Sequence, residues 1–179
     1  MTSRRSPDAS SRAADVAPIP VVFDVNVLVG AAIGGNSPFR SWPSPPPTSG
    51  NAYADCMGIV VDAAECALWI SPHIMSNTER VLVEGFKWPG DLLTRYLTIL
   101  LQTAEHSGGG IIDPPQTVDD CPDWEDNRIL DLAAEVGALL VVSEDADLTS
   151  MSPWRGTPIL RPREFAAKVD GMRRHQRRR

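Results

Sequence analysis

The stretch Pro20-Val-Val-Phe-Asp24 is a short apolar run that ends on an acid. This pattern is typical of a buried strand with a carboxylate at its carboxyl end. A second stretch, Leu139-Leu-Val-Val-Ser143, is the clearest strand in the chain, and Asp145 and Asp147 follow it closely. Both stretches therefore predict strands that bring acids to their carboxyl ends.

The sequence around these two strands alternates between strand and helix patterns. Short apolar runs predict further strands at 67–71, 110–113 and 158–160. Apolar spacing, together with capping, glycine and proline signals, predicts helices at 25–33, 53–66, 71–83, 91–105, 123–136 and 162–169. Strands that are apolar on both faces and separated by helices are typical of a parallel sheet covered on both sides. The sequence therefore predicts an α/β fold of three layers, α/β/α, with a short parallel sheet.

The chain of 179 residues predicts one domain with a tail at each end. Residues 1–17 are polar and without periodicity, which is typical of a disordered tail. The ordered domain is expected over residues 18–170, and a basic tail over residues 171–179. Within the domain, residues 34–51 are rich in proline and glycine, so we expect a long loop that is a lid, a binding loop or a disordered insertion.

The composition is that of a globular protein, with 42% hydrophobic and 22% charged residues. No stretch approaches the roughly eighteen consecutive apolar residues of a transmembrane helix, so we expect no membrane partner. The arginines near the N-terminus precede no long apolar segment, which argues against a secretory signal and predicts a cytoplasmic protein. Three cysteines cannot pair completely and lack the spacing of a zinc site, so we expect reduced thiols at Cys56, Cys66 and Cys121.

The formal charge of −6 is unevenly distributed along the chain. Five arginines lie in residues 173–179, and removing them leaves −11 for the rest. This balance argues against a surface that holds nucleic acid by general basic charge. The arginine tail is either a solvated end or a segment that contacts RNA phosphates.

Eleven acids lie between Asp113 and Asp147, with Arg128 as the only cation among them. Crowded carboxylates repel one another, and a bound divalent cation relieves the repulsion; a solvated acidic face is the alternative. Because the carboxyl ends of parallel strands meet at one edge, where such folds bind ligands, we expect Asp24 and the acids near Ser143 to meet there. Oxygen ligands of this kind favour Mg²⁺ or Mn²⁺.

Other catalytic patterns find little support in the sequence. No Ser-His or Cys-His pattern indicates a nucleophile, and the glycines at 108–110 lack the lysine partner of a phosphate-binding loop. A phosphotransfer enzyme of the haloacid dehalogenase type also has an aspartate after its first strand. That family has a second aspartate two residues later, whereas position 26 is an asparagine. The acids that we expect at the carboxyl ends of the strands suit a different chemistry, in which two metal ions about 3.5–4 Å apart hold a phosphodiester and activate water.

Four motifs in order resemble the PIN domain family, over about residues 20–168. They are Val21-Val-Phe-Asp-Val-Asn-Val-Leu-Val29, Cys121-Pro-Asp-Trp-Glu-Asp-Asn-Arg-Ile-Leu130, Val141-Val-Ser-Glu-Asp-Ala-Asp-Leu148 and Ile159-Leu-Arg-Pro-Arg-Glu-Phe165. PIN domains are metal-dependent ribonucleases, and many bacterial members are toxins of two-gene toxin–antitoxin systems. The resemblance therefore implies a PIN-like fold, RNA as substrate, a small antitoxin protein as partner, and a homodimer.

The resemblance also implies a catalytic site in which Asp24, Asp126 and Asp145 hold the metal ion. Asp123 and Asp147 are further candidate ligands. Local structure offers an alternative for each acid, because an aspartate at the start of a turn or helix also caps it.

Two positions depart from the family pattern. The helix after the second strand ordinarily carries a glutamate where this chain has Asn77, and Glu79 lies about 200° further around a helix. Glu144 stands where the family has glycine. Asn26 is expected to orient Asp24 or to cap the helix, and the Ser143 hydroxyl either contacts a phosphate or only ends its strand. The uncharged Asn77 favours an alternative function, a catalytically weakened PIN module that binds RNA or a protein partner.

Five tryptophans are spread along the chain: Trp42, Trp69, Trp88, Trp124 and Trp154. Trp42 lies in the proline-rich loop, and it is the one that we expect to stack on a base or on a partner. The other four are expected to anchor the core or a loop.

Overall fold

The computed structural model describes residues 17–34, 50–62, 65–176 and 178. The predicted N-terminal tail, apart from Ala17, lies outside the described residues. The same holds for residues 35–49, which include Trp42 and most of the predicted proline-rich loop, and for Arg177 and Arg179.

The centre of the described structure is a five-stranded sheet in which every pair of neighbouring strands is parallel. The strand order is β3-β2-β1-β4-β5. The strands are β1 (Ile19–Phe23), β2 (Cys66–Ile70), β3 (Gly110–Ile111), β4 (Leu140–Val142) and β5 (Ile159–Leu160). The short parallel sheet predicted from the apolar runs is therefore confirmed.

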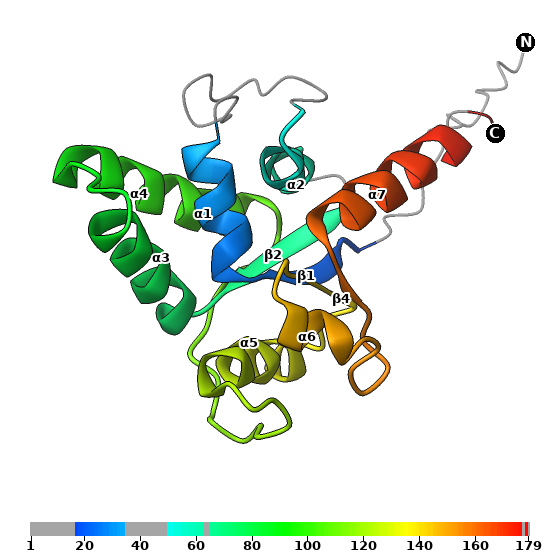
Figure 1. The fold of residues 1–179 in the computed structure, drawn as a ribbon. Helices are drawn as coiled ribbons and strands as arrows, with labels where there is room; N and C mark the ends of the chain where they lie inside the picture. The colour runs from blue at the N-terminus through cyan, green and yellow to red at the C-terminus, as the bar shows by residue number, and fades with distance from the viewer. Residues whose placement is uncertain (1–16, 35–49, 63–64, 177, 179) are drawn as a thin grey trace, which may run out of the picture.

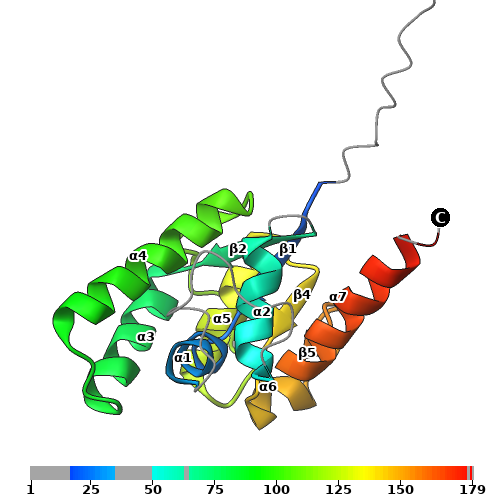
Figure 2. The ribbon, with the colours of Figure 1, turned by 90° about the horizontal axis from the view of Figure 1, so that it is seen from above.

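Helices cover both faces of this sheet. α1, α2 and α7 lie on one side and α5 on the other, while α4 packs against β2 and β3 (Figure 1). Seen from above, α2 lies between α1 and α7 (Figure 2). The helices are α1 (Val25–Ile33), α2 (Ala52–Val61), α3 (Pro72–Glu84), α4 (Gly90–His106), α5 (Trp124–Glu135), α6 (Ala146–Ser150) and α7 (Pro162–Gln176). This confirms the predicted three-layer α/β/α arrangement, which is consistent with a PIN-like fold.

Strand β1 is the point at which the winding of the sheet reverses. The chain builds β2 and then β3 on one side of β1, and it returns to place β4 and β5 on the other side. In open parallel sheets, ligands bind beyond the carboxyl ends of the two strands that flank such a reversal. Here Phe23 pairs with Val142, and Asp24 N donates to Val142 O at 2.9 Å. The residues that follow β1 and β4 are therefore neighbours.

The apolar character of the central strands follows from their position between two helical layers. Val21 and Val22 of β1, Leu68 of β2 and Val141 of β4 are fully buried. Phe23 meets Phe165 of α7 edge to face, with ring centroids 5.5 Å apart. Among the described residues, no helix combines the length and apolarity that crossing a bilayer requires.

The C-terminal helix is longer than the sequence pattern predicted. We expected it to end near residue 169 and a basic tail to begin at 171, but α7 continues to Gln176. Arg173 forms ion pairs with Glu65 at 2.7 Å and Asp62 at 3.0 Å, and these contacts hold the last turns against the end of α2 and the start of β2. Basic side chains also interact favourably with the carboxyl end of a helix. The first residues of the predicted tail are therefore part of the fold.

Candidate metal centre

Asp24 lies at the carboxyl end of β1, where it caps α1. Its Oδ1 accepts from Val25 N at 2.6 Å, and its Oδ2 accepts from Ser143 Oγ at 2.6 Å and Asn26 Nδ2 at 2.5 Å. The side chain is buried, and burial raises the pKa of Asp24, although the hydrogen bonds from Ser143 and Val25 oppose that shift. Both carboxylate oxygens are thus already held by the protein.

Ser143 and Asn26 link the ends of β4 and β1. The Ser143 hydroxyl donates to Asp24 and accepts from Asp145 N at 2.9 Å, and it is fully buried. Asn26 Oδ1 accepts from Glu144 N at 3.1 Å. The hydroxyl of Ser143 is therefore used inside the protein rather than offered to a phosphate, and both residues position Asp24 and the turn that follows β4.

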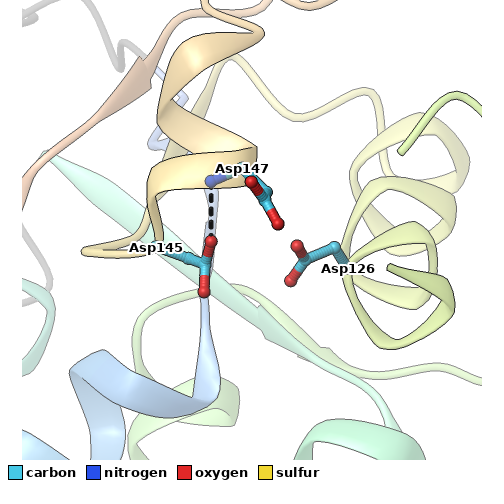
Figure 3. Close-up of side chains that lie close together, drawn as sticks. All are labelled: Asp126, Asp145 and Asp147. Atoms are coloured by element: carbon cyan, nitrogen blue, oxygen red, sulfur yellow. Dashed lines mark hydrogen bonds between the residues drawn. The ribbon is translucent and has the colours of Figure 1, made fainter. Parts of the chain in front are cut away.

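Three carboxylates come together beside this linked pair of strand ends (Figure 3). Asp126 on α5 and Asp145 and Asp147 at α6 each offer an oxygen, and these oxygens lie within 4.8 Å of one another. We call these residues the carboxylate cluster. Asp126 is buried, whereas Asp145 and Asp147 are exposed. Asp145 Oδ1 accepts from Asp147 N at 2.7 Å and so caps the short helix α6.

The surroundings of Asp126 disfavour its negative charge. Burial is the main cause that raises the pKa of Asp126 to about 7; the charges of Asp145 and Asp24 act in the same direction, and a hydrogen bond from Cys121 Sγ at 3.4 Å acts against it. A divalent cation would reverse this penalty, because it neutralises crowded carboxylates. The donor set fits a hard cation, since all three groups of the cluster are carboxylates. The described residues can therefore hold a metal ion here.

A cavity of about 510 Å³ opens beside the cluster. Asp24, Asp123, Asp126 and Asp145 line one part of it. Asp123 also caps α5, where its Oδ1 accepts from Glu125 N at 2.8 Å. Asp24 and Asp123 thus face the same cavity but stand outside the carboxylate cluster. The apolar part of the lining includes Val29, Ile33, Val81 and Phe86.

Asn77 lines the same cavity, whereas Glu79 is exposed on another side of α3. The helical spacing predicted this difference. Asn77 Oδ1 accepts from Arg80 Nη2 at 3.3 Å, and Asn77 Nδ2 lies 3.0 Å from His73 Nε2. Arg80 also reaches Glu125 of α5 at 3.2 Å. The amide of Asn77 is therefore held by its neighbours, and its oxygen points towards the guanidinium of Arg80.

Sequence reasoning missed several residues around the cavity. Cys121 forms a hydrogen bond with Asp126, and His73 forms one with Asn77. Arg80 links α3 to α5 through its ion pair with Glu125. The expectation that Trp124 anchors the core or a loop was wrong, because this side chain is 63% exposed. A signal was available: Asp123 was predicted as a helix cap, and the residue after a cap lies on the first turn of the helix, next to the candidate ligand Asp126.

We compared the chain with protein-family models and with curated protein sequences, and neither comparison gave a match.

Proposed function

We propose that this protein is a metal-dependent ribonuclease that hydrolyses phosphodiester bonds of RNA. The observation that carries the proposal is the meeting of carboxylates from three distant segments at the reversal point of the sheet. Asp24 follows β1, Asp126 lies on α5, and Asp145 follows β4. Carboxylate groups gathered in an open cavity suit a cation that binds a phosphodiester.

The metal ion in this proposal is Mg²⁺ or Mn²⁺, and Asp126, Asp145 and Asp147 would hold it. When bound, such an ion polarises a phosphoryl oxygen and lowers the pKa of a coordinated water. Asp24 contributes negative charge at a fixed place, because Ser143 and Asn26 hold its carboxylate. Hydrolysis adds the water oxygen to phosphorus and breaks the bond to one sugar oxygen. In this proposal the RNA strand reaches the metal ion through the side of the cavity that is open to solvent.

Membership of the PIN domain family is part of the same proposal, and it rests on the four ordered motifs and on the fold. It extends to a toxin role in the cytoplasm, with a small antitoxin protein as partner and a homodimer as the assembly. A gene for a short DNA-binding protein directly upstream would support the toxin role.

A second candidate function is a catalytically weakened PIN module that binds RNA or a protein partner. Asn77 favours this alternative, because it brings no charge to the cavity and its oxygen accepts from Arg80. The two candidates differ in a measurable way. The enzyme cleaves RNA when metal is added, whereas the module binds without cleavage.

The test incubates the purified chain with structured RNA in Mn²⁺ and in EDTA. We expect cleavage only with Mn²⁺, and we expect Asp145→Asn to reduce it by about 10²–10³-fold, because the exchange removes a charged ligand and keeps the volume. Asp119→Asn is the matched control, since Asp119 is an exposed acid of the same acidic segment and does not line the cavity. Equal activity of Asp145→Asn and Asp119→Asn would refute the assignment. Binding without cleavage at any metal concentration would favour the module.

A further inference from the structure

Trp124 is an exposed aromatic residue beside the acidic cavity. Its side chain is 63% exposed, although tryptophan is one of the largest apolar side chains. It is the first residue of α5, directly after the capping Asp123. Its two chain neighbours, Asp123 and Glu125, both line the cavity. Trp124 itself is not among the lining residues, so its side chain lies next to the cavity rather than in it, two residues from Asp126 of the carboxylate cluster.

One contact holds the indole from the side of α3. The ring of His73 meets Trp124 edge to face, with centroids 5.5 Å apart and an interplanar angle of 66°. His73 also lines the cavity. Burial lowers the pKa of His73, so the imidazole is neutral near pH 7 and makes an uncharged contact. An indole that is held by one ring contact and is otherwise largely exposed to solvent is suited to stacking.

Arg80 adds a positive charge next to the cavity, because it contacts two of the lining residues, Asn77 and Glu125. Its guanidinium bridges from Asn77 on α3 to Glu125 on α5, at 3.3 Å and 3.2 Å. The Arg80 side chain is about half exposed. A guanidinium has five N–H donors and matches the geometry of a phosphate group. A cation at this position offsets the repulsion that the neighbouring acids exert on a phosphate.

We infer that Trp124 and Arg80 form a subsite for one unpaired nucleotide of the RNA strand. The base stacks on the indole, and a phosphate next to the scissile one contacts the guanidinium. Aromatic stacking and a basic contact are the two features by which proteins hold single strands without reading sequence. The inference rests on the proposed ribonuclease function and adds to it a preference for unpaired over paired RNA at the cleavage site.

The test measures RNA binding by the full chain in an Asp145→Asn background and in EDTA, so that cleavage does not interfere. Fluorescence anisotropy is recorded with a labelled single strand and with its duplex. Stacking contributes about 1–3 kcal/mol per base, so Trp124→Ala should weaken single-strand binding by about 5–150-fold. Trp124→Phe should retain most of the affinity, because it keeps an aromatic face. Duplex binding should be nearly unchanged by either exchange.

Leu139→Ala is the matched control for loss of an exposed apolar side chain. Leu139 is 59% exposed and directly precedes β4, so it lies at the amino ends of the strands, opposite the carboxyl ends where the cavity is.

Arg80→Gln tests the phosphate contact. It should flatten the dependence of log affinity on log salt by about 0.7, the value for one phosphate contact on a single strand.

The possible outcomes separate this inference from the proposed function. Equal single-strand affinity in the Trp124→Ala and Leu139→Ala chains overturns the subsite, and cleavage by the wild-type chain would then leave the ribonuclease proposal intact. If the Asp145→Asn chain does not bind RNA and the wild-type chain does not cleave it, the subsite and the ribonuclease proposal are both overturned. If Trp124→Ala changes the sedimentation of the protein but not its RNA affinity, Trp124 belongs to an interface between copies, and the subsite is also overturned.

Discussion

Two buried carboxylates on the same helix have opposite surroundings. Asp131, in the middle of α5, accepts from Thr117 N and Val118 N at 2.8 Å and pairs with Arg128 at 2.7 Å. Asp126 lies on the first turn, and among the described residues only the Cys121 thiol donates a hydrogen bond to its carboxylate, which faces two further carboxylates in its cluster. The first acid joins α5 to the segment before it. The second is buried at a cost that the protein itself does not offset.

The difference gives a criterion for separating structural from functional acids. A buried charge is stabilising only when it is paired and hydrogen-bonded. Asp131 meets that condition, so its burial is explained by the fold. Asp126 does not, so its burial requires either a bound cation or a bound proton. Exchanges at these acids and at their hydrogen-bond partners test the two sides of this contrast.

The largest effect is expected from Asp131→Asn. The exchange leaves the guanidinium of Arg128 buried without its partner, and Arg128 Nε and Nη1 already have no hydrogen-bond partner among the described residues. Breaking a buried ion pair in this way costs about 3–5 kcal/mol. We expect the free energy of unfolding, measured by urea titration, to fall by that amount. A loss below about 1 kcal/mol would show that Asp131 does not need its charge.

The second effect concerns the pH dependence of stability in metal-free buffer. The pKa of Asp126 is raised to about 7 in the folded protein from 3.8, so the folded state binds the proton more tightly than the unfolded state. The stability from this group is therefore complete below pH 4 and is lost as the pH rises towards 7.

Asp126→Asn keeps the side chain uncharged and removes this loss. The variant should exceed the wild-type chain in unfolding free energy by on the order of 2–4 kcal/mol at pH 8, and the difference should vanish near pH 4. Saturating Mn²⁺ should reverse the order at pH 8, since only the wild type retains the third carboxylate. A difference in unfolding free energy that does not change with pH would contradict the conclusion that the buried charge of Asp126 is not offset by the protein.

The smallest effect is expected from Cys121→Ser. A hydroxyl is a stronger donor than a thiol, so it should stabilise the ionised form of Asp126 better than the bond at 3.4 Å does. The pKa of Asp126 should fall by about 0.5–1 unit. NMR titration of the carboxyl carbon would measure this shift directly. An unchanged pKa would mean that burial alone sets the contrast between the two acids of α5.

The fold was predictable from sequence because it depends on patterns that extend over many residues. Runs such as residues 20–24 and 139–143 are apolar on both faces only because helices cover both sides of the sheet. Element ends were less predictable. Helix α7 passes the predicted end because Arg173 finds Glu65 and Asp62 far away in the chain, and no local pattern contains that information.

The site was predictable in outline but not in its detail. The convergence of acids at one edge follows from the topology, which places Asp24 beside the residues after β4. The topology does not determine which acid joins the carboxylate cluster and which is held by hydrogen bonds. Whether an acid belongs to the cluster, as Asp147 does, or is held by Ser143, as Asp24 is, depends on side-chain directions. The exposure of Trp124 depends on what packs over it, and that is also a tertiary property.

The pairing of β1 with β4 has a consequence for biosynthesis. Of the described strands, β1 leaves the ribosome before the others, yet one of its edges has no neighbour until β4 has been translated. A nascent chain that stops before Leu140 contains Asp24 and Asp126, but it lacks Asp145, Asp147 and the strand that places Ser143 against Asp24. Synthesis therefore has a built-in delay, during which β1, β2 and β3 are already translated but the site is not yet assembled.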